Sequence, residues 1–169
     1  MKSQEIIEKV IYDPSEGRID KFDKDYSFLS NFYIHSQIHD GKEYLSNEHW
    51  YQSNKSTIEK SQEIIRIAPT PGIAKRMGGK KGFKGFKITL REDWENIKID
   101  IMMEGLRNKF SNLYLKKLLL QTKNAYLCEG NVWHDNFWGH CICDNCKDKP
   151  HNNILGQLLM IVRKELLNE

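Results

Sequence analysis

The chain has 169 residues, of which 39% are hydrophobic, 11% aromatic and 29% charged. A chain of this length can bury a sizeable core in one domain, and its composition excludes a disordered tail, a collagen-like fibre and a coiled coil. No run approaches the roughly 18 apolar residues that span a bilayer, and Met1–Val10 lacks the apolar stretch of a signal peptide. We therefore expect a cytoplasmic protein with no membrane partner.

The first 44 residues carry strand and turn signals. Asp40-Gly41 is a two-residue hairpin signal, and Pro14–Gly17 forms another expected turn. The segments expected to form strands on either side of these turns are Ile6–Tyr12, Arg18–Phe22, Phe32–His39 and Lys42–Leu45. A small antiparallel hairpin is therefore predicted near the N-terminus.

Helical signals dominate from Ser46 onward. Ser46 or Asn47 can cap a helix that begins at Glu48, Ser56-x-x-Glu59 has the pattern of a capping box, and Thr70-Pro71 starts a short helix that ends at Gly78. Apolar residues at helical spacing predict three further helices, which are Trp94–Phe110, Leu113–Leu120 and Ile154–Leu166. Ala125–Cys128 is expected to form a short strand. The predicted class is α+β, a single compact and mainly helical domain over residues 1–169.

The positive charge is concentrated in one segment. The formal net charge is +3, but Lys75–Arg91 holds seven basic residues and no acidic one, which leaves 19 basic against 23 acidic residues elsewhere. The same segment has glycines that let backbone amides approach phosphate oxygens, and it lacks the P-loop pattern. It is either a solvated loop with no special role or a site for phosphate, on a small anionic ligand or on nucleic acid.

Polar side chains line one face of the helix expected after Ser46, at positions i, i+3, i+4 and i+7, which are Glu48, Tyr51, Gln52 and Lys55. Such a stripe is either solvated or lines something polar and enclosed. The opposite side, with His49, Trp50 and Ser53, is no better as a core face, which favours the second interpretation.

Large aromatic residues surround Asp135 in the loop Trp133–Gly139. These rings can plug the edge of the core, or they can form a stacking platform for a planar base with Asp135 as the polar group. Phe28–Phe32 has a similar pattern ahead of the hairpin.

Three cysteines, Cys141, Cys143 and Cys146, form a C-x-C-x-x-C cluster, and His151 follows five residues later. In a reducing compartment these are either free thiols or, with His151 as the fourth ligand, a tetrahedral structural zinc site. A site closed by four protein ligands would hold the loop at about 140–151 and take no part in catalysis.

Six ordered blocks between Phe22 and Leu167 resemble the NADAR superfamily, also described as YbiA-like N-glycosidases. The blocks are LSNFY, DGKEYLSNEHWYQSNK, PGIAKRMGG, REDWENIKIDIMMEGLRNKF, HDNFWG and NNILGQLLMIVRKEL. The resemblance implies a compact α+β enzyme that hydrolyses N-glycosidic bonds without a catalytic cofactor. Its substrates would be ribosylaminopyrimidine phosphates of riboflavin synthesis, or ADP-ribose attached to guanine, including guanine in DNA.

The resemblance also implies roles for individual residues. Glu48, Lys55 and Asp135 match the catalytic positions, with Glu48 and Asp135 as the acid–base pair and Lys55 either as a phosphate ligand or as a nucleophile at C1′. The residues expected to bind the base, the sugar and the phosphates are Trp94, Trp138, Phe32, Asn31, Arg76, Lys80 and Lys81.

Two other classes of function stay open on the sequence. The protein can be a non-catalytic module that binds ADP-ribose or nucleic acid through Lys75–Arg91. It can also be a non-enzymatic partner that docks through its cysteine-rich loop.

Overall fold

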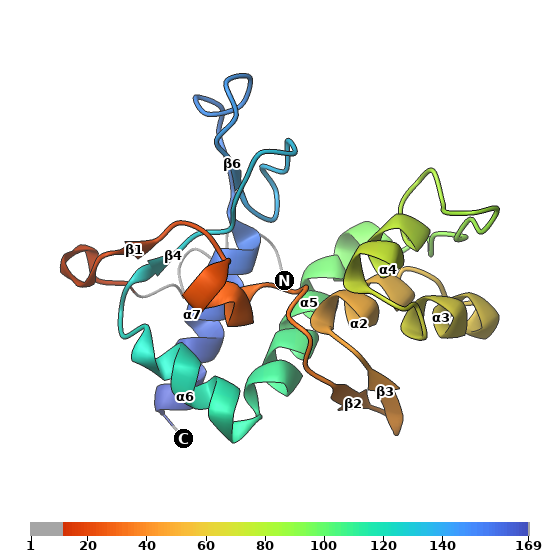
Figure 1. The fold of residues 1–169 in the computed structure, drawn as a ribbon, viewed down its shortest axis with the longest axis horizontal. Coiled ribbons are helices and arrows are strands. Elements are labelled where there is room, and N and C mark those ends of the chain that lie inside the picture. The colour runs from red at the N-terminus through yellow and green to blue at the C-terminus, as the bar shows by residue number, and fades with distance from the viewer. Residues whose placement is uncertain (1–11, 169) are drawn as a thin grey trace. The chain divides into compact units, whose positions relative to one another are not determined.

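The computed structural model describes residues 12–168, which form two compact units (Figure 1). The first unit contains residues 12–30 and 110–168, and the second contains residues 31–109. Within residues 12–168 no helix combines the length and the apolarity needed to cross a membrane. The expected strand at Ile6–Tyr12 lies mostly outside the described residues.

Helices and three two-stranded sheets make up both units, so the predicted α+β and mainly helical class is confirmed. The first unit holds η1 (Pro14–Glu16), β1 (Arg18–Ile19), η2 (Lys24–Leu29), α6 (Leu113–Gln121), β4 (Tyr126–Leu127), β5 (Gly130–Asn131), β6 (His140–Cys141) and α7 (Ile154–Leu167). The second holds β2 (Gln37–His39), β3 (Lys42–Tyr44), α2 (Asn47–Ser53), α3 (Glu59–Arg66) and α4 (Pro71–Met77). Helix α5 (Trp94–Phe110) belongs to the second unit except for its last residue.

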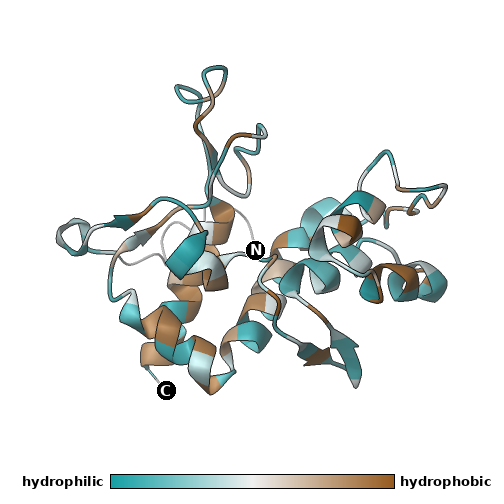
Figure 2. Ribbon diagram, viewed as in Figure 1, coloured by the Kyte–Doolittle hydropathy of each residue, from teal (hydrophilic) through white to brown (hydrophobic). Residues whose placement is uncertain are grey.

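The core of the first unit is built on α7, whose apolar side chains colour most of its ribbon brown in Figure 2. This helix packs against α6 and β4, which supply the buried Leu115, Leu119 and Leu127. Arg163 is also buried in α7, and its guanidinium donates to Thr122 Oγ1 (2.8 Å) and to Ala125 O (2.9 Å) just beyond α6. These bonds pair the buried guanidinium with the chain between α6 and β4.

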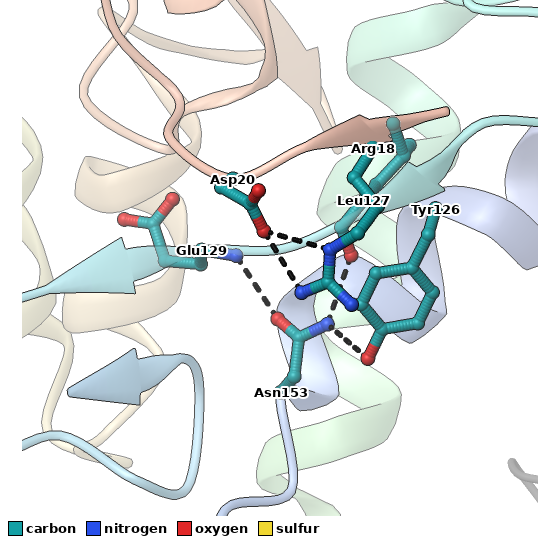
Figure 3. Close-up of polar contacts among 6 residues, drawn as sticks. All are labelled: Arg18, Asp20, Tyr126, Leu127, Glu129 and Asn153. Carbon is teal, nitrogen blue, oxygen red and sulfur yellow. Dashed lines mark hydrogen bonds and ion pairs between the residues drawn. The ribbon is translucent and has the colours of Figure 1, made fainter. Parts of the chain in front are cut away.

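A single asparagine ties the start of α7 to the neighbouring β4 strand (Figure 3). Asn153 adopts a left-handed backbone conformation (φ 48°), and its Nδ2 donates to Leu127 O (2.8 Å) and Tyr126 OH (3.2 Å). Its Oδ1 accepts from the Glu129 amide (3.0 Å). The amide therefore fixes β4 and the residue Glu129 that follows it, and β4 pairs in parallel with β1.

In the second unit, the predicted hairpin is confirmed. β2 and β3 pair antiparallel through a turn at Asp40 (φ 49°) and Gly41 (φ 75°), where positive φ at both positions matches a type I′ turn. Helix α2 lies at the centre of this unit and packs on α3 and α4. It also meets α5 closely, because a Cβ at Gly105 would lie 2.6 Å from Trp50 Cδ1.

Helix starts and ends follow their sequence signals with one exception. Ser46 caps α2, Thr70 caps α4 with Pro71 at its first position, and Gly78 ends α4, as predicted. The capping box at Ser56 is wrong, because α3 has Ile58 as its N-cap and no side-chain cap bond. Ser56 Oγ instead accepts from the Ile58 amide (3.2 Å), so that hydroxyl supports the turn before the helix.

Candidate active site

Every residue of α2 is buried, including the polar ones on both of its sides. The helix forms because Ser46 accepts a hydrogen bond from the His49 amide, and because its neighbours α3, α4 and α5 surround it. The interpretation of this polar stripe as a solvated face is therefore wrong. Its polar groups face an enclosed environment, in which each needs a partner.

Glu48 lies in the first turn of α2 and is only 5% exposed. Its Oε1 accepts a hydrogen bond from Gln52 Nε2, one turn later, at 2.7 Å. Gln52 is held in turn by the end of α4, since a Cβ at Gly78 would lie 3.0 Å from Gln52 Cδ and 3.1 Å from Gln52 Cβ. Gln52 Oε1 is buried and has no hydrogen-bond partner among the described residues.

Lys55 follows α2 and directs its ammonium to the same end of α4. Its Nζ donates to Gly78 O (3.2 Å) and lies over the rings of Tyr51 (5.4 Å) and Trp94 (5.8 Å). Burial lowers the pKa of Lys55, and the charge of Glu48 opposes that shift. Glu48, Lys55 and Trp94 are thus brought together, and the amine is set among aromatic rings.

The remaining polar residues near Glu48 hold the helix in place. His49 uses both ring nitrogens, with Ser46 Oγ at 2.8 Å and Ala68 O at 3.0 Å, and burial lowers its pKa. Asn31 is buried, its backbone oxygen accepts from the Glu48 amide (3.0 Å), and its Oδ1 accepts from Asn47 Nδ2 (2.8 Å). Its proposed contact with the sugar stays a prediction.

The basic segment folds into a small hairpin. Phe83 and Phe86 exchange backbone hydrogen bonds of 2.8 and 3.0 Å around a turn at Lys84 and Gly85, both with positive φ. Phe86 packs against the apolar cluster of α3 and α4. The Arg76 guanidinium lies 5.5 Å from the centre of the Phe83 ring, so this ring is covered by a cation.

The cations of this segment are not equivalent. Arg91 is paired with Asp93, and its amide donates to Lys55 O (2.8 Å), which ties the end of the segment to the turn that follows α2. Lys80 and Lys81 are exposed, and no carboxylate of the described residues lies within ion-pair distance of them. Phe32 is also exposed, with Lys75 Nζ 5.5 Å from the centre of its ring.

Asp135 and Trp138 belong to the first unit, and their pairing with Glu48 stays a prediction. Asp135 Oδ1 accepts from the amides of Phe137 (3.0 Å) and Trp138 (2.8 Å), which closes a tight turn. Asp135 itself is half-buried. Trp138 is half-buried and packs edge-on against Phe137.

The cysteine cluster has a different fourth member from the one predicted. His134 joins Cys141, Cys143 and Cys146, and the four donor atoms lie within 4.8 Å of one another. His151, the predicted fourth ligand, is not in this group, and its ring stacks on His140 (3.6 Å between centroids). These four residues, named here the Cys3His cluster, can hold a metal ion. The remaining thiol, Cys128, is outside it, and burial raises its pKa to about 11.

Three residues of these sites were given no role in them on the basis of the sequence. Gln52 was identified on the Glu48 face without a role, although its i+4 spacing from Glu48 is the spacing of helical hydrogen-bond pairs. Gly78 was identified only as a helix end. His134 lies seven residues before Cys141, and no spacing rule pointed to it.

Comparisons with known proteins identify the family of this chain. The NADAR domain model matches residues 19–167. N-glycosidase YbiA of Escherichia coli (strain K12) is 37% identical over 146 residues, which cover 86% of this chain and 84% of that protein. Riboflavin biosynthesis protein VVA0006 of Vibrio vulnificus is 33% identical over 145 residues, which cover 85% of this chain and 36% of that protein.

A solved structure shares the fold. The NMR structure of the E. coli protein YbiA matches with a TM-score of 0.75 and 35% sequence identity, covering 90% of this chain and 86% of that chain. The family model spans nearly all of the described residues, and the predicted resemblance is confirmed. The chain therefore belongs to the NADAR family.

Proposed function

We propose that this protein hydrolyses the C1′–N bond of a phosphorylated ribosyl substrate. The predicted enzyme class, an N-glycosidase, is confirmed by relatives of that name at 37% identity over 86% of the chain. The observation that carries the proposal for this site is the enclosed pair of Glu48 and Lys55, set beside Trp94. A buried carboxylate and a half-buried amine with a lowered pKa are groups that such a reaction can use.

Lys55 is proposed as the nucleophile. In a ribosylamine the exocyclic nitrogen opens the sugar ring and leaves C1′ as a protonated imine. The neutral Lys55 amine adds to C1′, a proton moves from Nζ to the departing nitrogen, and the C1′–N bond breaks to release the free base amine. Water then adds to the Lys55 imine and releases the ribose phosphate, which restores the amine.

Glu48 is proposed to relay the protons and to stabilise positive charge at C1′. Its carboxylate is fixed by Gln52 and is only 5% exposed, so its charge acts with little solvent screening. Asp135 is proposed as the second carboxylate, through its Oδ2. Trp94, Trp138 and Phe32 are proposed to hold the base, with Asn31 near the sugar.

The phosphates are proposed to bind at Arg76, Lys80 and Lys81. The exposure of these cations supports the assignment, since a charged loop attracts an anionic substrate over a Debye length. The names of relatives support a ribosylaminopyrimidine phosphate as the substrate. The number of cations in the hairpin favours a second candidate with more than one phosphate, ADP-ribose on guanine of a nucleotide or of DNA.

No cofactor is proposed for the bond cleavage itself. The Cys3His cluster is proposed to hold zinc in a structural role, because thiolate and imidazole donors suit that ion. The reaction is proposed to proceed in the cytoplasm, where thiols stay reduced.

The experiment is an incubation of the purified protein with ribosylaminopyrimidine phosphate and, separately, with ADP-ribosylated guanine DNA, followed by mass analysis. Release of the base from either substrate is expected, and the Glu48→Gln variant should lose it while the exposed control Glu59→Gln keeps it. Binding of ADP-ribose without any release would replace the proposal by the binding-module function.

Borohydride added during turnover tests the role of Lys55. Reduction of the imine should add the mass of one ribose phosphate unit to a peptide that contains Lys55, and Lys55→Met should abolish both the adduct and the turnover. Lys60→Met is the control, since Lys60 is exposed on α3. Turnover without a trapped adduct would assign Lys55 to phosphate binding.

A further inference from the structure

The Cys3His cluster lies on the same loop as Asp135. His134 precedes Asp135 directly, and Cys141 closes the loop in β6, which pairs in parallel with β5. Two cluster members therefore bracket the segment 135–140, which contains the proposed catalytic carboxylate and Trp138. Cys143 and Cys146 come from the loop that follows β6.

The spacing of the donor atoms fits a tetrahedral metal. Zn–S bonds of about 2.3 Å and Zn–N bonds of about 2.0 Å predict N···S separations of about 3.5 Å in a tetrahedron. His134 Nδ1 lies 3.2 Å from Cys146 Sγ and 3.4 Å from Cys143 Sγ. All four donors lie within 4.8 Å of one another, so small shifts of the side chains bring them to bonding distance of one ion.

The backbone around the cluster is arranged for metal-bound sulfur. The His134 amide donates to Cys141 Sγ (3.3 Å), and amide hydrogen bonds to sulfur stabilise a thiolate. The amides of Cys146 and Lys147 both donate to Cys143 O at 2.9 Å, which forms the tight turn between the two cysteines. His134 adopts φ 67°, a left-handed backbone conformation that few non-glycine residues adopt.

Hydrogen bonds connect this cluster to the turn of Asp135. Asn131 Nδ2 donates to Asp135 O (2.7 Å), and Asn131 Oδ1 accepts from the amides of Trp133 and Asp135. Asn136 Oδ1 accepts from the Cys141 amide (2.8 Å). Each end of the Asp135 turn is thus joined to a cluster residue by the chain itself or by one side-chain amide.

We propose that His134, Cys141, Cys143 and Cys146 bind one zinc ion, and that this ion holds the turn that presents Asp135, so that activity depends on metal occupancy. The four protein ligands close the coordination sphere, so the ion binds no substrate. The effect on activity rests on the proposed role of Asp135, whereas the metal site does not.

Zinc content tests the ligand set. Protein purified in a non-thiol reductant is dialysed and measured by elemental analysis, for the wild-type chain and for the matched variants His134→Ala and His151→Ala. We expect about one zinc per chain in the wild type and in His151→Ala, and at least a fivefold lower content in His134→Ala. Equal content in both variants would overturn the ligand assignment.

Cobalt provides a readout that does not depend on a variant's folding. Wild-type chain freed of zinc with a chelator and loaded with one equivalent of Co²⁺ should give the sulfur-to-cobalt charge-transfer and visible bands of tetrahedral thiolate coordination. A spectrum of octahedral aqueous cobalt would exclude the site.

Activity of the same wild-type preparations tests the link to Asp135. Removal of zinc should lower kcat at least tenfold, and restored zinc should recover it. Zinc binding with an unchanged kcat after removal would overturn the link to Asp135. Zinc bound at one per chain with no turnover in the loaded protein would contradict the N-glycosidase proposal and leave the metal site standing.

Discussion

Substituting Gly78 by alanine perturbs Glu48 without touching it. Gly78 has an ordinary helical φ of −77°, so alanine adds no backbone strain there. The added Cβ would overlap Gln52 Oε1 and lie 3.0 Å from Gln52 Cδ. Gln52 is 4% exposed and has little room to move, and it is the donor to Glu48 Oε1 at 2.7 Å.

The expected size of the effect has two parts. Overpacking a tight site costs about 1–3 kcal/mol of unfolding free energy. Loss of a hydrogen bond to a charged group costs about 1.5–3 kcal/mol, which corresponds to a fall of about 10- to 150-fold in kcat if the bond is needed in the transition state. Urea unfolding measures the first part, and the glycosidase assay measures the second.

Gly72→Ala is the matched control, since a Cβ there meets only Thr70 Oγ1 at 3.9 Å. It should be neutral or slightly stabilising, because alanine favours a helix by up to about 1 kcal/mol over glycine. On a Gln52→Ala background, Gly78→Ala should cost less than about 1 kcal/mol, because Gln52 Oε1 and Cδ are gone and only the Cβ at position 52, 3.1 Å away, remains. An equal cost on both backgrounds would refute the steric reasoning.

Three further predictions concern other parts of the molecule. Arg163→Met should lower the unfolding free energy by about 2–4 kcal/mol in urea, because it removes two buried hydrogen bonds after α6; a loss under 0.5 kcal/mol would contradict it. Burial lowers the pKa of His39 to about 4, so the unfolded chain binds the extra proton and stability should fall by up to about 3 kcal/mol as pH drops from 6.5 to 4. His39→Phe should flatten that slope, and an unchanged urea midpoint profile would count against this origin. Replacing Lys80 and Lys81 by glutamine should raise KM for the phosphorylated substrate severalfold and weaken its salt dependence with little change in kcat, unlike Lys60→Gln.

The helices could be predicted because their signals are local. Trp94–Phe110 has apolar residues at helical spacing, and α4 has Thr70 and Pro71 at its start and Gly78 at its end. A capping motif can still be used differently, as Ser56 shows. Its backbone oxygen accepts from Gln62 Nε2 (2.7 Å), and its hydroxyl serves the turn instead of the helix.

Some site residues could likewise be identified from local spacing, and others could not. Glu48 and Lys55 were identified because helical spacing would place them on one face. Glu48 is buried in α2, whereas α2 ends at Ser53 and Lys55 follows it, half-buried. The contact of Gly78 with the site depends on the side chain of Gln52, 26 positions earlier. No local sequence pattern contains both residues. His134, which lies beside the cysteines, itself has a left-handed backbone conformation. Loop conformations of this kind cannot be predicted from the spacing of residues in the sequence.

The order of the two units along the chain has a consequence for synthesis. Residues 31–109 form an uninterrupted stretch, whereas the first unit needs both residues 12–30 and residues 110–168. A ribosome therefore delivers Glu48 and Lys55 with all the neighbours of their unit before it delivers any of the later segment. Strand β1 must wait for β4, its parallel partner more than a hundred residues away, so the half of the protein that carries Asp135 is the slower one to assemble.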